Sequence, residues 1–262
     1  EKRRVLALAE EYVCPGRVRT FRGLGVDLVI GRREGYRIWD LDGRELLDLH
    51  LNGGVFNLGH RNPELVATLR DALDTLDVGN HHFPSAARAE LGESLARHTP
   101  GDLQYSVFAS GGGEAIDCAL KTARHATKRR KIVSVAKGYH GHTGLALAAG
   151  DDRFSRMFLS EGPPGEFVQV PWNDLDAMSA ALSGDDVAAV VLETIPATLG
   201  FPPPAPGYLA RVKALCTQRG ALYIADEVQT GFGRTGTLCA SEQHDVEPDI
   251  LVTGKGLSGG RY

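Results

Sequence analysis

The chain has little of several features that mark specialised proteins. Its 262 residues include only four cysteines, Cys14, Cys118, Cys216 and Cys239, and no Cys-x-x-Cys motif. This spacing excludes a disulfide framework and a cysteine-rich metal site, so we expect reduced thiols. No apolar run approaches the roughly 20 residues that a membrane-spanning helix needs. The sequence contains no internal repeat and no low-complexity tract.

An excess of charge of either sign is also lacking. The 29 basic and 33 acidic residues give a formal net charge of −4. Nothing therefore indicates binding to nucleic acid or to an anionic membrane surface. The first residues, Glu1-Lys2-Arg3-Arg4, lack the apolar segment and cleavage site of a signal peptide. We expect a cytoplasmic protein. Because 42% of the residues are hydrophobic, we also expect a sizeable core.

The first 60 residues predict a small α+β segment. Residues 1–14 have the pattern of a short helix that Pro15-Gly16 would break. Residues 35–44 alternate apolar and polar side chains and end in Asp42-Gly43, which predicts a hairpin with a returning strand at 46–49. Residues 51–60 are glycine-rich and predict a loop.

Farther along, short apolar runs alternate with helical patterns. Asn62-Pro63-Glu64 predicts the start of a helix that continues to about residue 76. The predicted strands are 105–109, 131–136, 168–170, 187–193, 222–226 and 249–253, and the predicted helices are 86–98, 111–128, 175–182 and 207–219. Such alternation predicts an α/β fold with a mostly parallel sheet and helices on both of its faces.

The carboxyl ends of these strands carry an unusual set of residues. Asp226 ends one strand, and Lys255, set among glycines, follows the next strand 29 residues later. Residues 110–115 form a glycine turn that opens a helix, which suits a phosphate but also suits a plain tight turn. Tyr139 follows a further strand, where its ring would stack on a heterocycle or pack in the core. A lone Asp in this place is commonly a loop cap.

Other ligand motifs do not fit. Gly113 is not followed by the third glycine of G-x-G-x-x-G, and Gly256 stands where a P-loop has Ser or Thr. His140 and His142 would suit a metal, but no acid or cysteine set accompanies them, so we predict none. A phosphate cradle, a stacking ring, an acid for a ring nitrogen and a lysine amine are together what pyridoxal phosphate requires.

These stretches resemble the class III aminotransferases, the ornithine, acetylornithine and putrescine type, which use pyridoxal 5′-phosphate and have fold type I. The resemblance covers nearly the whole chain from residue 35. It rests on residues 58–60, 110–115, 139–141, 225–236 and 248–256, and the block from Asp226 to Lys255 is highly specific. It implies an aminotransferase that moves an amino group from an amino acid, ω-amino acid or diamine to a keto acid by a ping-pong reaction.

The resemblance also implies roles for residues of the block. Lys255 would be the catalytic lysine that forms the Schiff base with the cofactor and shuttles the proton. Asp226 would be catalytic through its pairing with the pyridine nitrogen. Val228 would pack on the ring face opposite Tyr139, and Gln229 would reach the phenolic oxygen.

Further cofactor-binding residues follow from the other matching stretches. Gly112 and Gly113 would hold the phosphate, although many relatives have Ser or Thr in place of Gly113. Tyr139 and His140 belong to the matching Tyr-His-Gly. Glu193 matches a glutamate near the substrate carboxylate, but Thr194 stands where relatives usually have Pro.

The same relatives suggest an organisation for the chain. We expect residues 1–60 to belong to a small domain and residues 61–262 to form a large cofactor-binding domain. Relatives continue well beyond Lys255, so the carboxyl-terminal small domain is expected to be missing from this sequence. A homodimer is expected. An aminomutase or epimerase of the same fold, or a catalytically incomplete cofactor-binding fragment, stays open as an alternative.

Overall fold

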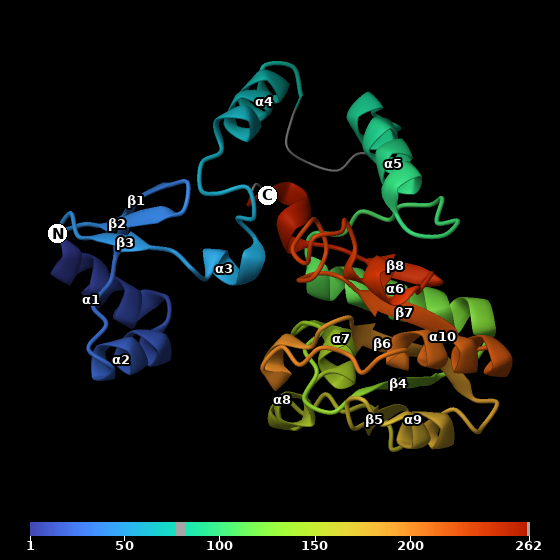
Figure 1. The fold of residues 1–262 in the computed structure, drawn as a ribbon. Coiled ribbons are helices and arrows are strands. Elements are labelled where there is room, and N and C mark those ends of the chain that lie inside the picture. The colour runs from blue at the N-terminus through green and yellow to red at the C-terminus, as the bar shows by residue number, and fades with distance from the viewer. Residues whose placement is uncertain (77–81, 261–262) are drawn as a thin grey trace. The chain divides into compact units, whose positions relative to one another are not determined.

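The computed structural model describes residues 1–76 and 82–260 (Figure 1). The chain forms two compact units, which are described separately. The N-terminal unit comprises Glu1–Gly79 with Gly259–Arg261, and the sheet unit comprises Asn80–Ser258. The predicted division after residue 60, into a small-domain segment and a large cofactor-binding domain, stays a prediction.

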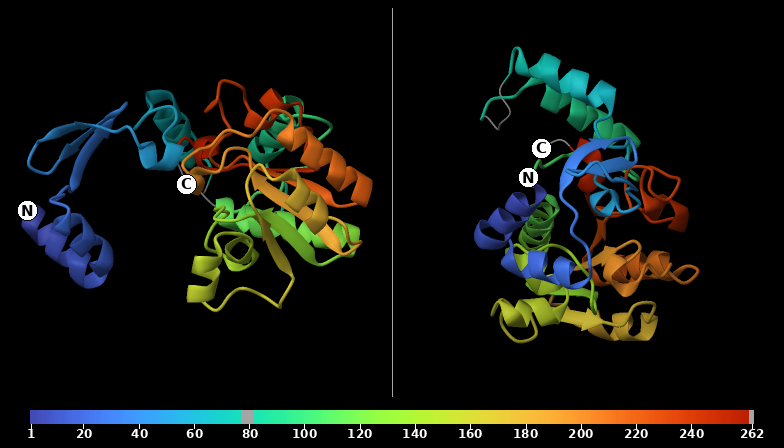
Figure 2. Two further views of the ribbon diagram at one scale, coloured as in Figure 1. Left: turned by 60° about the horizontal axis from the view of Figure 1, so that its bottom comes forward. Right: turned by 90° about the vertical axis from the view of Figure 1, so that its left-hand side faces the viewer.

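The N-terminal unit is an α+β segment, as predicted. Its elements are α1 (Lys2–Tyr12), α2 (Pro15–Gly23), β1 (Ile30–Glu34), β2 (Arg37–Asp40), β3 (Glu45–Leu47), α3 (Leu51–Gly54) and α4 (Pro63–Leu73). The hairpin is confirmed, because β2 and β3 pair antiparallel on either side of Gly43, whose φ is +85°. Helix α2, which packs beside α1 (Figure 2), is not among the elements expected from the sequence. Pro15 begins this helix, since proline is tolerated at the first helical position.

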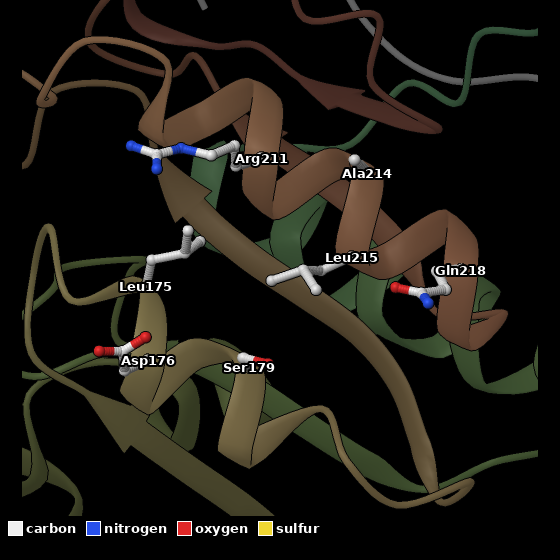
Figure 3. A pocket seen from close by; sticks show the side chains of 7 residues that line it. All are labelled: Leu175, Asp176, Ser179, Arg211, Ala214, Leu215 and Gln218. Carbon is white, nitrogen blue, oxygen red and sulfur yellow. The ribbon is translucent and has the colours of Figure 1, made fainter.

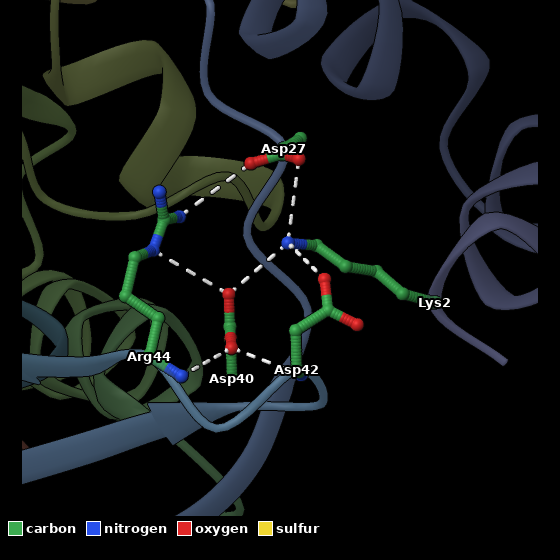
Figure 4. A network of polar contacts seen from close by, with 5 residues as sticks. All are labelled: Lys2, Asp27, Asp40, Asp42 and Arg44. Carbon is green, nitrogen blue, oxygen red and sulfur yellow. Dashed lines mark hydrogen bonds and ion pairs between the residues drawn. The ribbon is translucent and has the colours of Figure 1, made fainter.

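A network of charges joins the start of α1 to the hairpin (Figure 4). The Nζ atom of Lys2 lies 3.0 Å from Asp40, 3.1 Å from Asp42 and 3.3 Å from Asp27. Asp40 is buried, and its second oxygen accepts hydrogen bonds from the amides of Asp42 and Arg44. The hydrogen bond with Asp40 raises the pKa of Lys2. Burial of Asp40 acts to raise its own pKa, but its hydrogen bonds and the Lys2 charge leave that pKa lowered.

The sheet unit is built on a five-stranded parallel sheet. Its strands are β4 (Lys131–Val135), β5 (Phe167–Val170), β6 (Val187–Glu193), β7 (Leu222–Asp226) and β8 (Ile250–Val252). Its main helices are α5 (Ala86–His98), α6 (Gly112–Thr127), α7 (Gly144–Ala149), α8 (Asp152–Met157), α9 (Leu175–Ala181) and α10 (Tyr208–Arg219). The strand order is β5-β4-β6-β7-β8, with every pair parallel (Figure 1).

Helices cover both faces of this sheet, which confirms the prediction. Alternate residues of β6 and β7 enter two different cores, as the two-residue period of a strand requires. Val190, Leu192 and Tyr223 pack with α9 and α10. Val191 and Ile224 pack with α6 and α7. Because both faces are buried, β6 and β7 are mostly apolar runs, and each ends in an acid.

One predicted strand is wrong. Residues 105–109 form no regular element and have no ladder partner within the described ranges. Tyr105 is 95% exposed and Val107 is 72% exposed. The residue types suit a strand, but a strand also needs a neighbour to pair its backbone groups, and the apolar pattern alone cannot supply one.

We expect Lys2→Met to destabilise the N-terminal unit, because the buried Asp40 carboxylate would lose its cation. The lowered pKa of Asp40 gives a stabilisation that is present above its ordinary value of 3.8 and is lost as the pH falls through the folded-state value. Urea unfolding should therefore show a loss of stability at pH 7 that persists down to pH 3.8 and shrinks only below it. Arg3→Met is the control, since Arg3 is exposed. An equal loss in both variants would contradict the assignment.

Candidate active site

Two carboxylates meet at adjacent strand ends of the sheet unit. The register of β6 and β7 places Glu193 directly beside Asp226, and both are buried. The register of β7 and β8 places Asp226 beside Val252, three residues before Lys255. The predicted acid and lysine thus follow neighbouring strands at the same edge of the sheet, where open α/β sheets bind ligands.

Asp226 is held by a buried histidine. The Nδ1 atom of His140 lies 2.7 Å from Oδ2 of Asp226, and the His140 side chain has no exposed surface. The other oxygen of Asp226 accepts a hydrogen bond of 3.1 Å from the amide of Val228. His140 follows β4, so this pair joins the ends of two strands that are separated by β6. Since a carboxylate has about four acceptor positions, Asp226 can accept further hydrogen bonds.

Glu193 lies at the end of the intervening strand β6, and both of its carboxylate oxygens accept hydrogen bonds from backbone amides. One oxygen accepts a hydrogen bond of 2.8 Å from the amide of Tyr139, and the other accepts one of 3.2 Å from the amide of Ala197. These bonds fix the loop that carries Tyr139 and His140. The role predicted for Glu193 near a substrate carboxylate stays a prediction.

Charge and burial shift the pKa values of this cluster. Burial lowers the pKa of His140, but the hydrogen bond and charge of Asp226 and the charge of Glu193 outweigh it and leave the pKa raised. Burial raises the pKa of Glu193, with the His140 cation opposing and the Asp226 charge adding to the rise. The pKa of Tyr139 is raised by burial and then by the Glu193 charge. The charges of the two acids thus favour the protonated form of His140, while its burial opposes it.

The glycine turn is packed against the other site loops. Gly111 caps α6, and Gly112 and Gly113 form its first turn, where backbone N–H groups have no partner within the helix. A Cβ atom on Gly141, whose φ is +122°, would lie 2.6 Å from the Cα atom of Gly113. A Cβ atom on Gly113 would lie 3.1 Å from Oγ1 of Thr143. Only glycine allows the two loops to approach this closely.

Val228 connects the glycine turn to the lysine segment. A Cβ atom on Gly112 would lie 3.0 Å from Cγ1 of Val228, and one on Gly254 would lie 3.2 Å from the same atom. Lys255 follows Gly254, is partly buried, and has a φ of +26° in a short 3-10 turn. Gln229 follows Val228 and is also partly buried. Gly112 and Gly254 therefore both lie against Val228.

Tyr139 keeps part of its ring accessible. It is 37% exposed, its hydroxyl lies 3.0 Å from Nδ1 of His142, and the two rings meet edge to face. Its backbone amide is fixed by Glu193, and the neighbouring His140 is fixed by Asp226. An exposed aromatic face on a fixed backbone is suited to stacking on a planar ligand.

Glu227 and Thr194 have a structural role that is not evident from the sequence. Glu227 is fully buried, and its oxygens accept hydrogen bonds from the hydroxyls of Thr194 and Thr230 and from the amides of Ala240 and Ser241. Thr194 therefore supplies one of four donors that satisfy a buried carboxylate. The sequence shows a second acid directly after Asp226, but the donors on Thr194, Ala240 and Ser241 lie 33, 13 and 14 residues away from it.

A cavity of about 340 Å³ lies elsewhere, between α9 and α10 (Figure 3). Its lining includes Leu175, Asp176, Arg211 and Leu215. None of the predicted cofactor residues lines it. In the described part of the chain, no helix is long and apolar enough to cross a membrane.

Gly141→Ala should destabilise the protein by about 2 kcal/mol, because the new Cβ atom would combine a positive φ with a clash against Gly113. Gly111→Ala is the matched control. Gly111 has a φ of −174°, and a Cβ atom there would meet nothing within 4 Å. Denaturant unfolding compares the two. Equal stabilities would contradict the close approach of these loops.

The pairing of His140 with Asp226 predicts a proton that stays on the ring above the ordinary pKa of 6.5. A raised pKa in the folded state stabilises the fold fully below 6.5, and this contribution is lost as the pH rises through the folded-state value. An NMR titration of the ring nitrogens should show the raised pKa in the native sequence. In Asp226→Asn, burial remains while the main partner charge is gone, so the pKa should fall. An unchanged His140 titration would contradict the pairing.

Comparison with known proteins places this geometry in a family. The model of class-III aminotransferases matches residues 22–262. An uncharacterised aminotransferase of Archaeoglobus fulgidus is 52% identical over 261 residues, which are 100% of this chain and 61% of that protein. This chain thus spans about 61% of the length of that curated relative.

Solved structures of aminotransferases are also similar to this chain. The ornithine aminotransferase of Toxoplasma gondii matches with a TM-score of 0.87 and 30% identity over 100% of this chain and 61% of its own. The taurine:2-oxoglutarate aminotransferase of Bifidobacterium kashiwanohense, solved with PLP and glutamate, matches with a TM-score of 0.87 and 31% identity over 99% of this chain and 63% of its own. The predicted α/β fold, fold type I, is confirmed. The chain belongs to the class-III aminotransferase family.

Proposed function

We propose that the protein is a pyridoxal-phosphate-dependent aminotransferase. It would move an amino group from an amino acid, ω-amino acid or diamine to a keto acid. The observation that carries the proposal is the buried Asp226, held by His140 at the end of β7, with Lys255 following the adjacent strand β8. Membership of the family and the printed activities of the matched structures support it.

The residues present fit this cofactor. Gly112 and Gly113 have no side chains and let Val228 and Thr143 pack closely against the start of α6, whose first amides suit a phosphate. Asp226 has acceptor capacity left and is held in place by His140. Gly112 and Gly254 both lie against Val228, which brings the phosphate turn close to the segment before Lys255.

When bound, pyridoxal phosphate supplies an aldehyde that condenses with amines and a ring that accepts electrons. Gly112 and Gly113 would hold its phosphate through backbone amides, and Val228 and Tyr139 would hold its ring from opposite faces. The Asp226 carboxylate would keep a proton on the ring nitrogen. The Nζ atom of Lys255 would take a proton from the substrate carbon and return it at the next step.

Two further properties belong to the proposal. A homodimer is supported by the family resemblance and by large apolar side chains that the N-terminal unit leaves exposed, such as Tyr12, Leu24 and Leu49. A cytoplasmic location is supported by the four scattered cysteines, which we expect to be reduced thiols.

The lysine is tested by trapping. With pyridoxal phosphate, the protein should show a visible absorption band that borohydride bleaches, and mass spectrometry should find the pyridoxyl group on the peptide with Lys255. Lys255→Ala should lose that adduct and at least about 10³-fold in turnover. Lys121→Ala, on the exposed side of α6, is the control and should keep both. A Lys255→Ala protein with full turnover would contradict the proposal.

A further inference from the structure

The N-terminal unit contains a basic cavity that the proposed function does not use. Its volume is about 290 Å³. Three guanidinium side chains line it, together with an aromatic ring, an imidazole and two glycines. These are Arg32, Arg33 and Arg61, with Phe56, His60, Gly31 and Gly260.

The walls of the cavity are fixed by backbone contacts. Gly35, in the turn after β1, exchanges two hydrogen bonds with His60, of 2.9 and 2.6 Å. Gly59 has a φ of +84°, and a Cβ atom there would lie 3.2 Å from the Cα atom of Gly35. A Cβ atom on Gly260 would clash with the Phe56 ring. The strand that carries two of the arginines is thus locked to the loop that carries the third.

His60 presents a nitrogen without a partner. Its Nε2 lies 2.6 Å from Oδ2 of Asp48, which holds the ring in place. Its Nδ1 is buried and makes no hydrogen bond with any part of the chain that the structure describes. The side chain of His60 is only 3% exposed. A buried polar atom of this kind gains from a ligand that completes its hydrogen bonding.

The positive charge of the cavity is poorly compensated. Arg32 pairs with Glu34 at 2.6 Å and lies over the Trp39 ring. Arg33 lies over the Phe56 ring, with 5.3 Å between its Cζ atom and the ring centroid. Among residues 1–76 and 82–260, neither Arg33 nor Arg61 has an acidic ion-pair partner. Two guanidinium groups beside one cavity therefore have free donors.

We propose that this cavity is a binding site for a small oxyanion. Guanidinium groups match the two oxygens of a carboxylate or phosphate with paired N–H donors. Nδ1 of His60 would add a third contact, while Asp48 holds Nε2. Carboxylates and phosphates share this chemistry. The site lies within the N-terminal unit and does not depend on the proposed aminotransferase activity.

The test uses this chain and two probes, glutarate and inorganic phosphate, in isothermal titration calorimetry at constant ionic strength. Arg33→Gln and Arg61→Gln should each weaken binding of the favoured probe by about tenfold, the loss of one charge-assisted contact. Arg4→Gln removes the same charge from an exposed position on α1 and should bind like the native sequence. The better probe identifies whether the natural ligand carries a carboxylate or a phosphate.

Two results would overturn the proposal. One is a lack of binding by either probe to the native sequence. The other is equal weakening by Arg4→Gln, which would mean attraction by overall charge alone. Thermal unfolding of each variant without a probe shows that it is folded. Lys255→Ala should bind the probes like the native sequence, so failure of the oxyanion site and failure of the cofactor proposal give different results.

Discussion

The candidate site depends on the burial of a carboxylate at the end of a parallel strand. Asp226 is removed from water by the packing of β7, and such a group is costly unless it has partners. His140 and the amide of Val228 supply them. The pair also sets the loop geometry, because the histidine that satisfies Asp226 belongs to the loop that presents Tyr139. Stability and site geometry therefore rest on the same contact.

The next residue, Glu227, is also a buried carboxylate, but it has more hydrogen-bond partners. Its oxygens accept hydrogen bonds from four donors in three separate segments. Its carboxylate is fully used, so it fixes the loop that follows β7. Asp226 has fewer donors and keeps acceptor capacity for a ligand. Two adjacent acids thus have distinct roles, one in holding the loop and one in the proposed chemistry, because their surroundings differ.

Glycine has a comparable role where the loops meet. Gly113 and Gly141 approach so closely that a side chain on either would displace the other loop or its neighbour. Oγ1 of Thr143 lies 3.1 Å from the place that a Cβ atom on Gly113 would take. The hydroxyl of Thr143 therefore occupies space that a larger residue at 113 would need. In the N-terminal unit, Gly59 and Gly35 make a similar approach and fix the walls of the basic cavity.

The sequence by itself determined the strands β4 to β8, the helices α5, α6, α9 and α10, the hairpin of β2 and β3, and the acid and lysine at the strand ends. These follow from local periodicity, turn residues and a specific motif. Only the tertiary structure decided that residues 105–109 form no ladder, that His140 pairs with Asp226 and that Thr194 serves Glu227. Those contacts depend on the strand order β5-β4-β6-β7-β8, which brings together residues 86 and 33 positions apart. A local pattern specifies that a residue is buried, but the choice of its partner is made by the packing of the whole sheet.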